Sequence, residues 1–92
     1  MSKELTAFKK HFERNCSIKV IDTIEESRYP HWKRLCFQSL NCTQMVMLAE
    51  YIFDTFSNPG DFSHDLPKVH SYGDTLCLTV DVAEINKKIL NL

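Results

Sequence analysis

The chain has 92 residues, a formal charge of −1, and 43% hydrophobic against 25% charged residues. This length predicts one domain over residues 1–92, a size at which oligomerisation is a natural source of added stability. The near-neutral charge excludes a strong overall field for nucleic acid, which is therefore not expected as a partner. No apolar run of about 18 residues occurs, and the start lacks an apolar signal-peptide core. We therefore expect a cytoplasmic protein without membrane contact.

The first half of the chain is predicted to form one helix and then two strands. A helix is predicted over 3–14, where apolar residues recur at helical spacing: Leu5, Phe8 and Phe12. From Cys16 apolar residues alternate with polar ones, which predicts a strand over 16–24. A second strand is predicted over 31–40. The short loop between the two strands indicates antiparallel pairing.

A long helix is predicted over 41–57, beginning with Asn41 and Gln44 at capping-box spacing. Its expected core stripe comprises Met45, Leu48, Ala49, Ile52 and Phe56. A helix this apolar is expected to bury more than one face, one against the sheet and one against a second copy. The residues assigned to that interface are Met45, Val46, Ala49 and Phe53. The alternative is that all of them fill a wide core.

The last third of the chain is predicted to form a β-hairpin followed by a short helix. A strand over 67–72 leads into a tight turn at Gly73-Asp74 and then into an alternating strand over 75–82. Asp81 is expected to cap a final helix. The order α-β-β-α-β-β-α predicts an α+β fold of two layers, with a four-stranded antiparallel sheet covered by helices.

Two stretches of this sequence, HWKRLCFQSLNCTQMVMLAEYIFDTF and HDLPKVHSYGDTLCLTV, carry a resemblance to a known family. Together with the element order, they make the chain resemble the pterin-4a-carbinolamine dehydratase family from about Leu5 to Leu92. The resemblance implies a site in which a histidine pair and a third histidine surround a pterin ring. Imidazole can there protonate the departing hydroxyl and accept a ring proton near neutral pH.

The histidines of that motif are only partly present in this chain. His64 stands for the first histidine of the pair, whereas Asp65 occupies the second position. The third position falls near Asp81 and Val82, and His70 is an additional histidine on the predicted third strand. The catalytic candidates are thus His64 from the resemblance, Asp65 as a residue that orients or replaces an imidazole, and His70 as a second imidazole. For a bound pterin the resemblance implies ligand-binding candidates at Tyr72, Pro67 and Lys68, with no other cofactor and no metal.

Three functions remain open on this reading. The first is a non-catalytic or regulatory homo-oligomer, a dimer or tetramer, that acts on a protein partner. Members of the family that resemble this chain also serve as oligomeric cofactors of other proteins. The second is an active 4a-hydroxytetrahydrobiopterin dehydratase, a lyase, with a modified active site. The third is an unrelated small α+β inhibitor or regulatory module, such as a ferredoxin-like domain, although that fold should open with a strand.

Two other patterns involve groups that could bind a metal or act as nucleophiles. Metal-ligand side chains occur at Asp61, His64, Asp65 and His70, but their spacing is not diagnostic of a metal site. His70 and Cys77 lie on adjacent predicted strands, as a nucleophilic cysteine and its base would. Nothing in the sequence orients that pair. Because the four cysteines form no CxxC pair, we expect free and mostly buried thiols.

A third pattern is the aromatic and basic segment that begins the second predicted strand. Trp32 precedes Lys33 and Arg34. Such a combination is typical of a surface that binds a partner or a phosphate. It is equally typical of an edge strand protected by charge.

Overall fold

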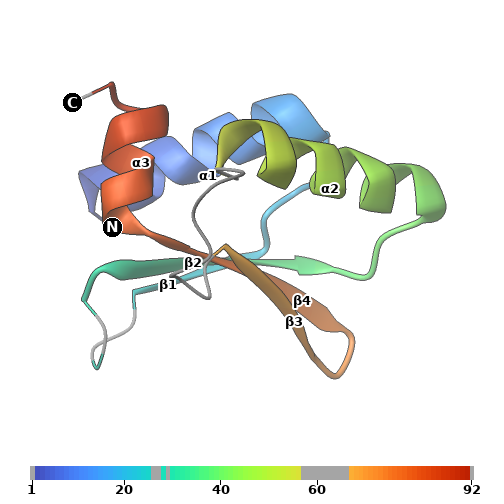
Figure 1. Cartoon of the computed structure of the whole chain (residues 1–92). Coiled ribbons are helices and arrows are strands. Elements are labelled where there is room, and N and C mark those ends of the chain that lie inside the picture. Colours follow the sequence, from blue (N-terminus) through green and yellow to red (C-terminus); the bar gives the residue numbers. More distant parts are fainter. Residues whose placement is uncertain (1, 26–27, 29, 57–66, 92) are drawn as a thin grey trace.

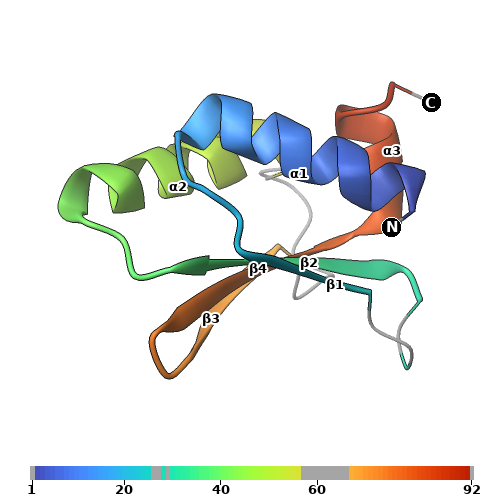
Figure 2. The same ribbon diagram turned by 180° about the vertical axis from the view of Figure 1, so that it is seen from behind.

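The computed structural model describes residues 2–25, 28, 30–56 and 67–91. Along these residues it contains α1 (Lys3–Cys16), β1 (Asp22–Glu25), β2 (Trp32–Gln38), α2 (Cys42–Thr55), β3 (Lys68–Tyr72), β4 (Thr75–Asp81) and α3 (Val82–Lys88). The predicted α+β class and element order are confirmed. All three described helices lie on one side of the sheet, so the molecule has two layers and one sheet face without helices (Figures 1 and 2).

The sheet has the strand order β1-β2-β4-β3, and every neighbouring pair is antiparallel. The two central strands supply its apolar centre, because Leu35 lies opposite Leu78 and Phe37 lies opposite Leu76. The predicted pairing of the first two strands is confirmed. The interpretation of the second strand as an edge strand is wrong, since β2 lies between β1 and β4.

The hydrophobic core lies between the helices and the sheet, and aromatic rings fill much of it. Phe12 of α1 stacks on Phe37 of β2, with ring centroids 5.2 Å apart. Phe8 meets Phe56 edge to face at 5.7 Å, and Tyr51 meets Phe12 in the same way at 5.5 Å. Such pairs add to the gain from burial itself, so these rings tie α1, α2 and the sheet together.

The strand predicted over 16–24 is the main local error. α1 continues to Cys16, and Ser17 ends it in the left-handed conformation with φ 55°. The sheet pairing of β1 begins only at Asp22. Ile18 and Val20 are nevertheless buried, so the alternation in sequence reflects an extended segment with one side against the core. Burial requires only the alternation, whereas a strand also requires a hydrogen-bonded neighbour.

The capping box of α2 is confirmed, but the core stripe predicted for this helix is partly wrong. Asn41 accepts a hydrogen bond from the Gln44 backbone at 2.8 Å, and the Gln44 side chain accepts one from the Asn41 backbone at 3.1 Å. Met45 and Ala49 are exposed instead of buried. The buried face is carried by Leu48, Tyr51 and Phe56, with Ile52 packed against it.

Tyr51 takes a core position because α1 supplies a partner for its hydroxyl group. Its oxygen lies 2.8 Å from Nδ1 of His11. A buried phenol needs such a partner to avoid a desolvation penalty. His11 is accordingly half-buried against α2.

The C-terminal hairpin and helix follow the sequence pattern closely. Gly73 has φ 60° in the two-residue turn between β3 and β4, a conformation that glycine adopts at little cost. Asp81 caps α3 by accepting a hydrogen bond from the Ala83 backbone at 2.7 Å. α3 begins at Val82, where the predicted cap at Asp81 places its start, so β4 ends one residue earlier than the predicted strand over 75–82.

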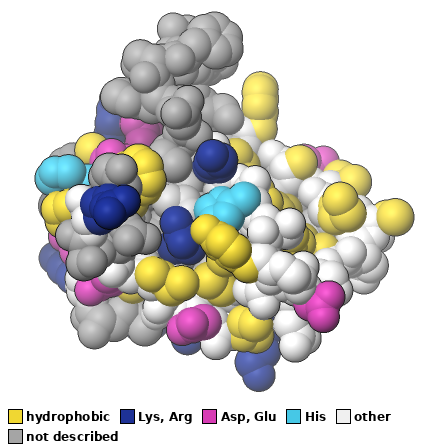
Figure 3. Space-filling model, turned by 90° about the horizontal axis from the view of Figure 1, so that it is seen from below, with side chains coloured by type: hydrophobic (Ala, Val, Ile, Leu, Met, Phe, Trp, Pro, Cys, Tyr) yellow, Lys and Arg dark blue, Asp and Glu magenta, His cyan; other side chains and the backbone are white. Residues whose placement is uncertain are grey.

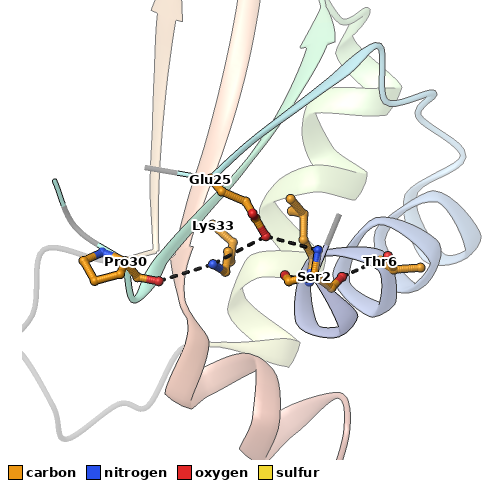
Figure 4. Close-up of polar contacts among 6 residues, drawn as sticks. Ser2, Thr6, Glu25, Pro30 and Lys33 are labelled. Carbon is orange, nitrogen blue, oxygen red and sulfur yellow. Dashed lines mark hydrogen bonds and ion pairs between the residues drawn. The ribbon is translucent and has the colours of Figure 1, made fainter. Parts of the chain in front are cut away.

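A small polar cluster joins the start of α1 to the sheet (Figure 4). Lys33 is only 8% exposed. Its Nζ lies 3.6 Å from Oε1 of Glu25 and donates to the Pro30 carbonyl at 3.2 Å. The backbone nitrogen of Ser2 donates to the same Glu25 oxygen at 3.2 Å. Hydrogen bonds from Ser2 lower the pKa of Glu25, and the Lys33 ammonium adds to that effect.

Candidate functional site

The sheet face that carries none of the described helices is the first candidate site, and we call it the open face. Side chains alternate between the two faces of a strand. The residues that precede and follow the buried Leu35 and Leu78 in sequence therefore point to the open face. Arg34 on β2 lies opposite Thr79 on β4, which in turn lies opposite Lys68 on β3. Figure 3 looks onto this face and shows histidine, basic and hydrophobic side chains adjoining near its middle.

Tyr72 is the aromatic centre of this face, and two other side chains contact its ring. The His70 ring meets it edge to face, with centroids 5.0 Å apart at 83°. The guanidinium carbon of Arg34 lies 5.9 Å from the Tyr72 ring centroid, within cation–π range. Nε of Arg34 donates to Oγ1 of Thr79 at 3.0 Å. An arginine, an imidazole and a phenol ring are thus held side by side.

The electrostatics of this cluster favour a neutral imidazole. Burial lowers the pKa of His70, and the positive charges of Arg34 and Lys68 lower it further. Its Nδ1 atom is buried and has no hydrogen-bond partner within the described part of the chain. A neutral imidazole can donate with one nitrogen and accept with the other. Together with Arg34, it can therefore bind a planar polar molecule or an anionic group at Tyr72.

The predicted ligand-binding residues fall partly on this face. Lys68, His70 and Tyr72 do lie on the same side of β3, as their spacing predicts. Pro67 directly precedes β3 and is half-buried. Arg34 was not predicted as a member of this group, because only the strand order places β2 within reach of β3 side chains. The segment Trp32-Lys33-Arg34 is divided, since Lys33 faces the helix side next to Glu25.

Two of the three predicted catalytic residues, His64 and Asp65, lie outside the described residues, as does Asp61. The third histidine of the motif was expected near Asp81 and Val82, where the Asp81 carboxylate caps α3. Over residues 2–25, 28, 30–56 and 67–91, no group of three or more metal-ligand side chains could hold a metal ion.

The second candidate site is the outward face of α2. Its apolar side chains are strongly exposed: Met45 and Val46 are each 57% exposed and Phe53 is 64% exposed. Ala49 lies between them on the same side of the helix and is also exposed. We call Met45, Val46, Ala49 and Phe53 the α2 stripe. All four residues assigned to an interface are thus accessible on one face of one helix.

Comparison with known proteins adds no relative to this picture. In the described part of the chain, no helix has the length and apolar character needed to cross a membrane.

Neither the protein-family models, nor the curated proteins, nor the solved structures contain a match to the chain. The functional argument therefore depends on the two faces described above.

Proposed function

We propose that this protein is a non-catalytic homo-oligomer of pterin-4a-carbinolamine dehydratase-like fold that regulates a protein partner by binding it. The observation that carries the proposal is the α2 stripe. Exposed apolar area costs roughly 25 cal/mol per Å² relative to burial, and a contiguous exposed apolar patch commonly marks an interaction surface. The opposite side of α2 already packs into the core, so the stripe is available for a second contact.

The charges of α2 favour a second copy of this chain as the occupant of the stripe. Glu50 and Asp54 are the only charged residues of α2, and both lie in its C-terminal half. In an antiparallel helix pair about a two-fold axis, these carboxylates approach the positive N-terminal end of the partner helix. A parallel pair of α2 helices would instead place the carboxylates of one copy beside those of the other. We therefore propose an antiparallel contact along α2, which is about 21 Å long.

Sedimentation equilibrium over a range of concentrations tests the oligomer. We expect Phe53→Asp to raise the dimer Kd by more than about tenfold, because a large apolar side chain at the centre of an interface carries about 2 kcal/mol or more. Ile21→Asp is the matched control, since Ile21 is also exposed but lies outside the stripe. A wild-type chain that stays monomeric at the highest soluble concentration would refute the proposal.

Partner binding requires its own control. A partner captured with the wild-type chain counts in favour only if Phe53→Asp abolishes its binding and Ile21→Asp does not. Equal loss with both variants, or with neither, would remove the α2 stripe from the recognition surface.

A dehydratase activity is the second candidate, and the cluster of His70, Tyr72 and Arg34 favours it. This cluster can stack and hydrogen-bond a planar heterocycle such as a pterin. Against this activity, the resemblance places the third histidine near Asp81 and Val82, neither of which is a histidine, and the Asp81 carboxylate caps a helix. A carbinolamine dehydration assay separates the two functions. A rate that collapses in His64→Ala would overturn the non-catalytic proposal, and failure to bind any pterin at millimolar concentration would overturn the dehydratase.

A further inference from the structure

A row of four side chains crosses the open face from edge to edge. The strand register places Asp22, Cys36, Cys77 and His70 directly opposite one another in sequence across β1, β2, β4 and β3. The two cysteines occupy the central strands. Their Sγ atoms are 3.1 Å apart, and both thiols are buried and reduced.

This pair has the backbone arrangement that a disulfide needs. Directly opposed residues of antiparallel strands have Cα atoms about 4.5 or 5.5 Å apart, within the range seen for disulfides. The two sulfur atoms already point toward each other, since one thiol donates to the other. Shortening their separation to a bond of about 2.05 Å requires side-chain rotation and small shifts of the two strands, without unpairing the sheet.

The residues opposite the two thiols differ, and this difference decides which thiol attacks an oxidant and which resolves the product. Cys77 has His70 opposite it on one side, while Cys36 has Asp22 opposite it on the other. Burial raises the pKa of Cys36 to about 12, with Cys77 and the Asp22 carboxylate adding to the effect. Lys68 lies in the next row of the sheet, on the same strand as His70, while the positive charge of Arg34 acts on Cys36. Cys77 therefore has an imidazole opposite it that can accept the thiol proton, whereas the Asp22 carboxylate disfavours a thiolate at Cys36.

We propose that Cys36 and Cys77 are a redox pair that a hydroperoxide oxidises to a reversible disulfide across β2 and β4. The Cys77 thiolate attacks the terminal oxygen of the hydroperoxide, the O–O bond breaks, and the alkoxide leaves and takes up a proton. Cys36 then attacks the resulting Cys77 sulfenic acid, the S–O bond breaks, and water leaves. Two thiols lose two electrons and two protons, while the hydroperoxide becomes an alcohol and water. A dithiol reverses the step by thiol–disulfide exchange.

The remaining cysteines provide internal controls for this proposal. Cys16 is buried on the helix side, and burial raises its pKa to about 11. Cys42 is exposed at the start of α2. Exposure alone would direct oxidation to Cys42, whereas a built redox pair directs it to two buried positions.

The test is oxidation of the full chain with hydrogen peroxide, followed by blocking of free thiols in denaturant and peptide mapping. We expect a monomeric product with an intramolecular link between Cys36 and Cys77, reversed by dithiothreitol, with Cys16 still free. Oxidation confined to Cys42, or a disulfide joining two chains through Cys42 alone, would overturn the proposal. This mapping uses the wild-type chain, so it does not depend on any variant folding.

Single variants test the assigned roles. In Cys36→Ser, the Cys77 sulfenic acid loses its resolving thiol, and we expect a dimedone adduct at Cys77. In Cys77→Ser, we expect no adduct at Cys36. Cys16→Ser and Cys42→Ser serve as matched controls that retain the disulfide. Adducts at Cys36 but not at Cys77 would contradict the assignment of Cys77 as the attacking thiol.

Discussion

The helix-covered face and the open face of the sheet use the same strands but bury opposite kinds of side chain. On the covered face, Leu35, Phe37 and Leu78 pack against the rings of α1 and α2. On the open face, Thr79 is buried through its bond with Arg34, and the Cys36–Cys77 thiols are buried beside it. The first face supplies stability through area removed from water, while the second holds polar groups that remain available for binding and redox chemistry.

Removing one aromatic ring from each face should give the largest difference in the free energy of unfolding between two variants. Phe12 is fully buried and contacts Phe37 and Tyr51, so Phe12→Ala should lower the free energy of unfolding by about 3–5 kcal/mol. Tyr72 is exposed on the open face, so Tyr72→Ala should cost less than about 1 kcal/mol, mainly through the lost cation–π contact. Urea denaturation measures both values. Similar losses for the two variants would contradict the division between the faces.

A smaller effect on stability should come from removing the hydrogen bond between Arg34 and Thr79 on the open face. Thr79→Val keeps the side-chain shape but removes the acceptor for Arg34. We expect a loss of about 0.5–1.5 kcal/mol in the free energy of unfolding, the usual net value of such a bond. Thr79→Ser is the control, because it keeps the hydroxyl group and removes only a methyl group. If the Thr79→Val variant is as stable as the wild-type protein, the Arg34–Thr79 hydrogen bond makes no net contribution to the free energy of unfolding.

The smallest expected effect is a pH dependence shared by one histidine on each side of the sheet. Burial and the nearby Arg14 lower the pKa of His11, while burial, Arg34 and Lys68 lower that of His70. Below the usual value of 6.5, the unfolded chain then binds more protons than the folded one. Stability should therefore be fully present above pH 6.5 and fall as the pH drops toward the lowered pKa values.

Denaturation curves between pH 7.5 and 5, a range of about 2.5 units in which most carboxylates stay ionised, measure this dependence. His11→Gln should remove the contribution from the helix side, and His70→Gln that from the open face. A wild-type protein whose stability does not change across this range would contradict both assignments.

Several elements could be predicted because their signals are local. The capping box of Asn41 and Gln44, the turn at Gly73 and the cap at Asp81 each depend on side chains a few residues apart. The alternation in β4 likewise identifies its core side. These features were predicted correctly, and the element order followed from them.

The errors arise where a partner distant in sequence decides the outcome. Tyr51 enters the core because its hydroxyl group forms a hydrogen bond with His11, 40 residues earlier in the sequence. Residues 17–20 alternate like a strand, but the paired register of β1 with β2 begins at Asp22, preceded only by the hydrogen bond from the Ile21 backbone nitrogen to the Cys36 carbonyl. Lys33 and Arg34 are neighbours in sequence, yet their side chains lie on opposite faces of the sheet, and Lys33 forms an ion pair with Glu25.

The amino-acid sequence by itself determined the fold class, the helix caps, the hairpin turn and the apolar character of α2. Those depend on backbone propensity and on periodicity, which act within a few residues. Only the tertiary structure decided that Arg34 meets Tyr72 and that Cys36 faces Cys77, 41 residues apart. The strand order β1-β2-β4-β3 brings these side chains together, and that order results from packing the whole sheet against its helices.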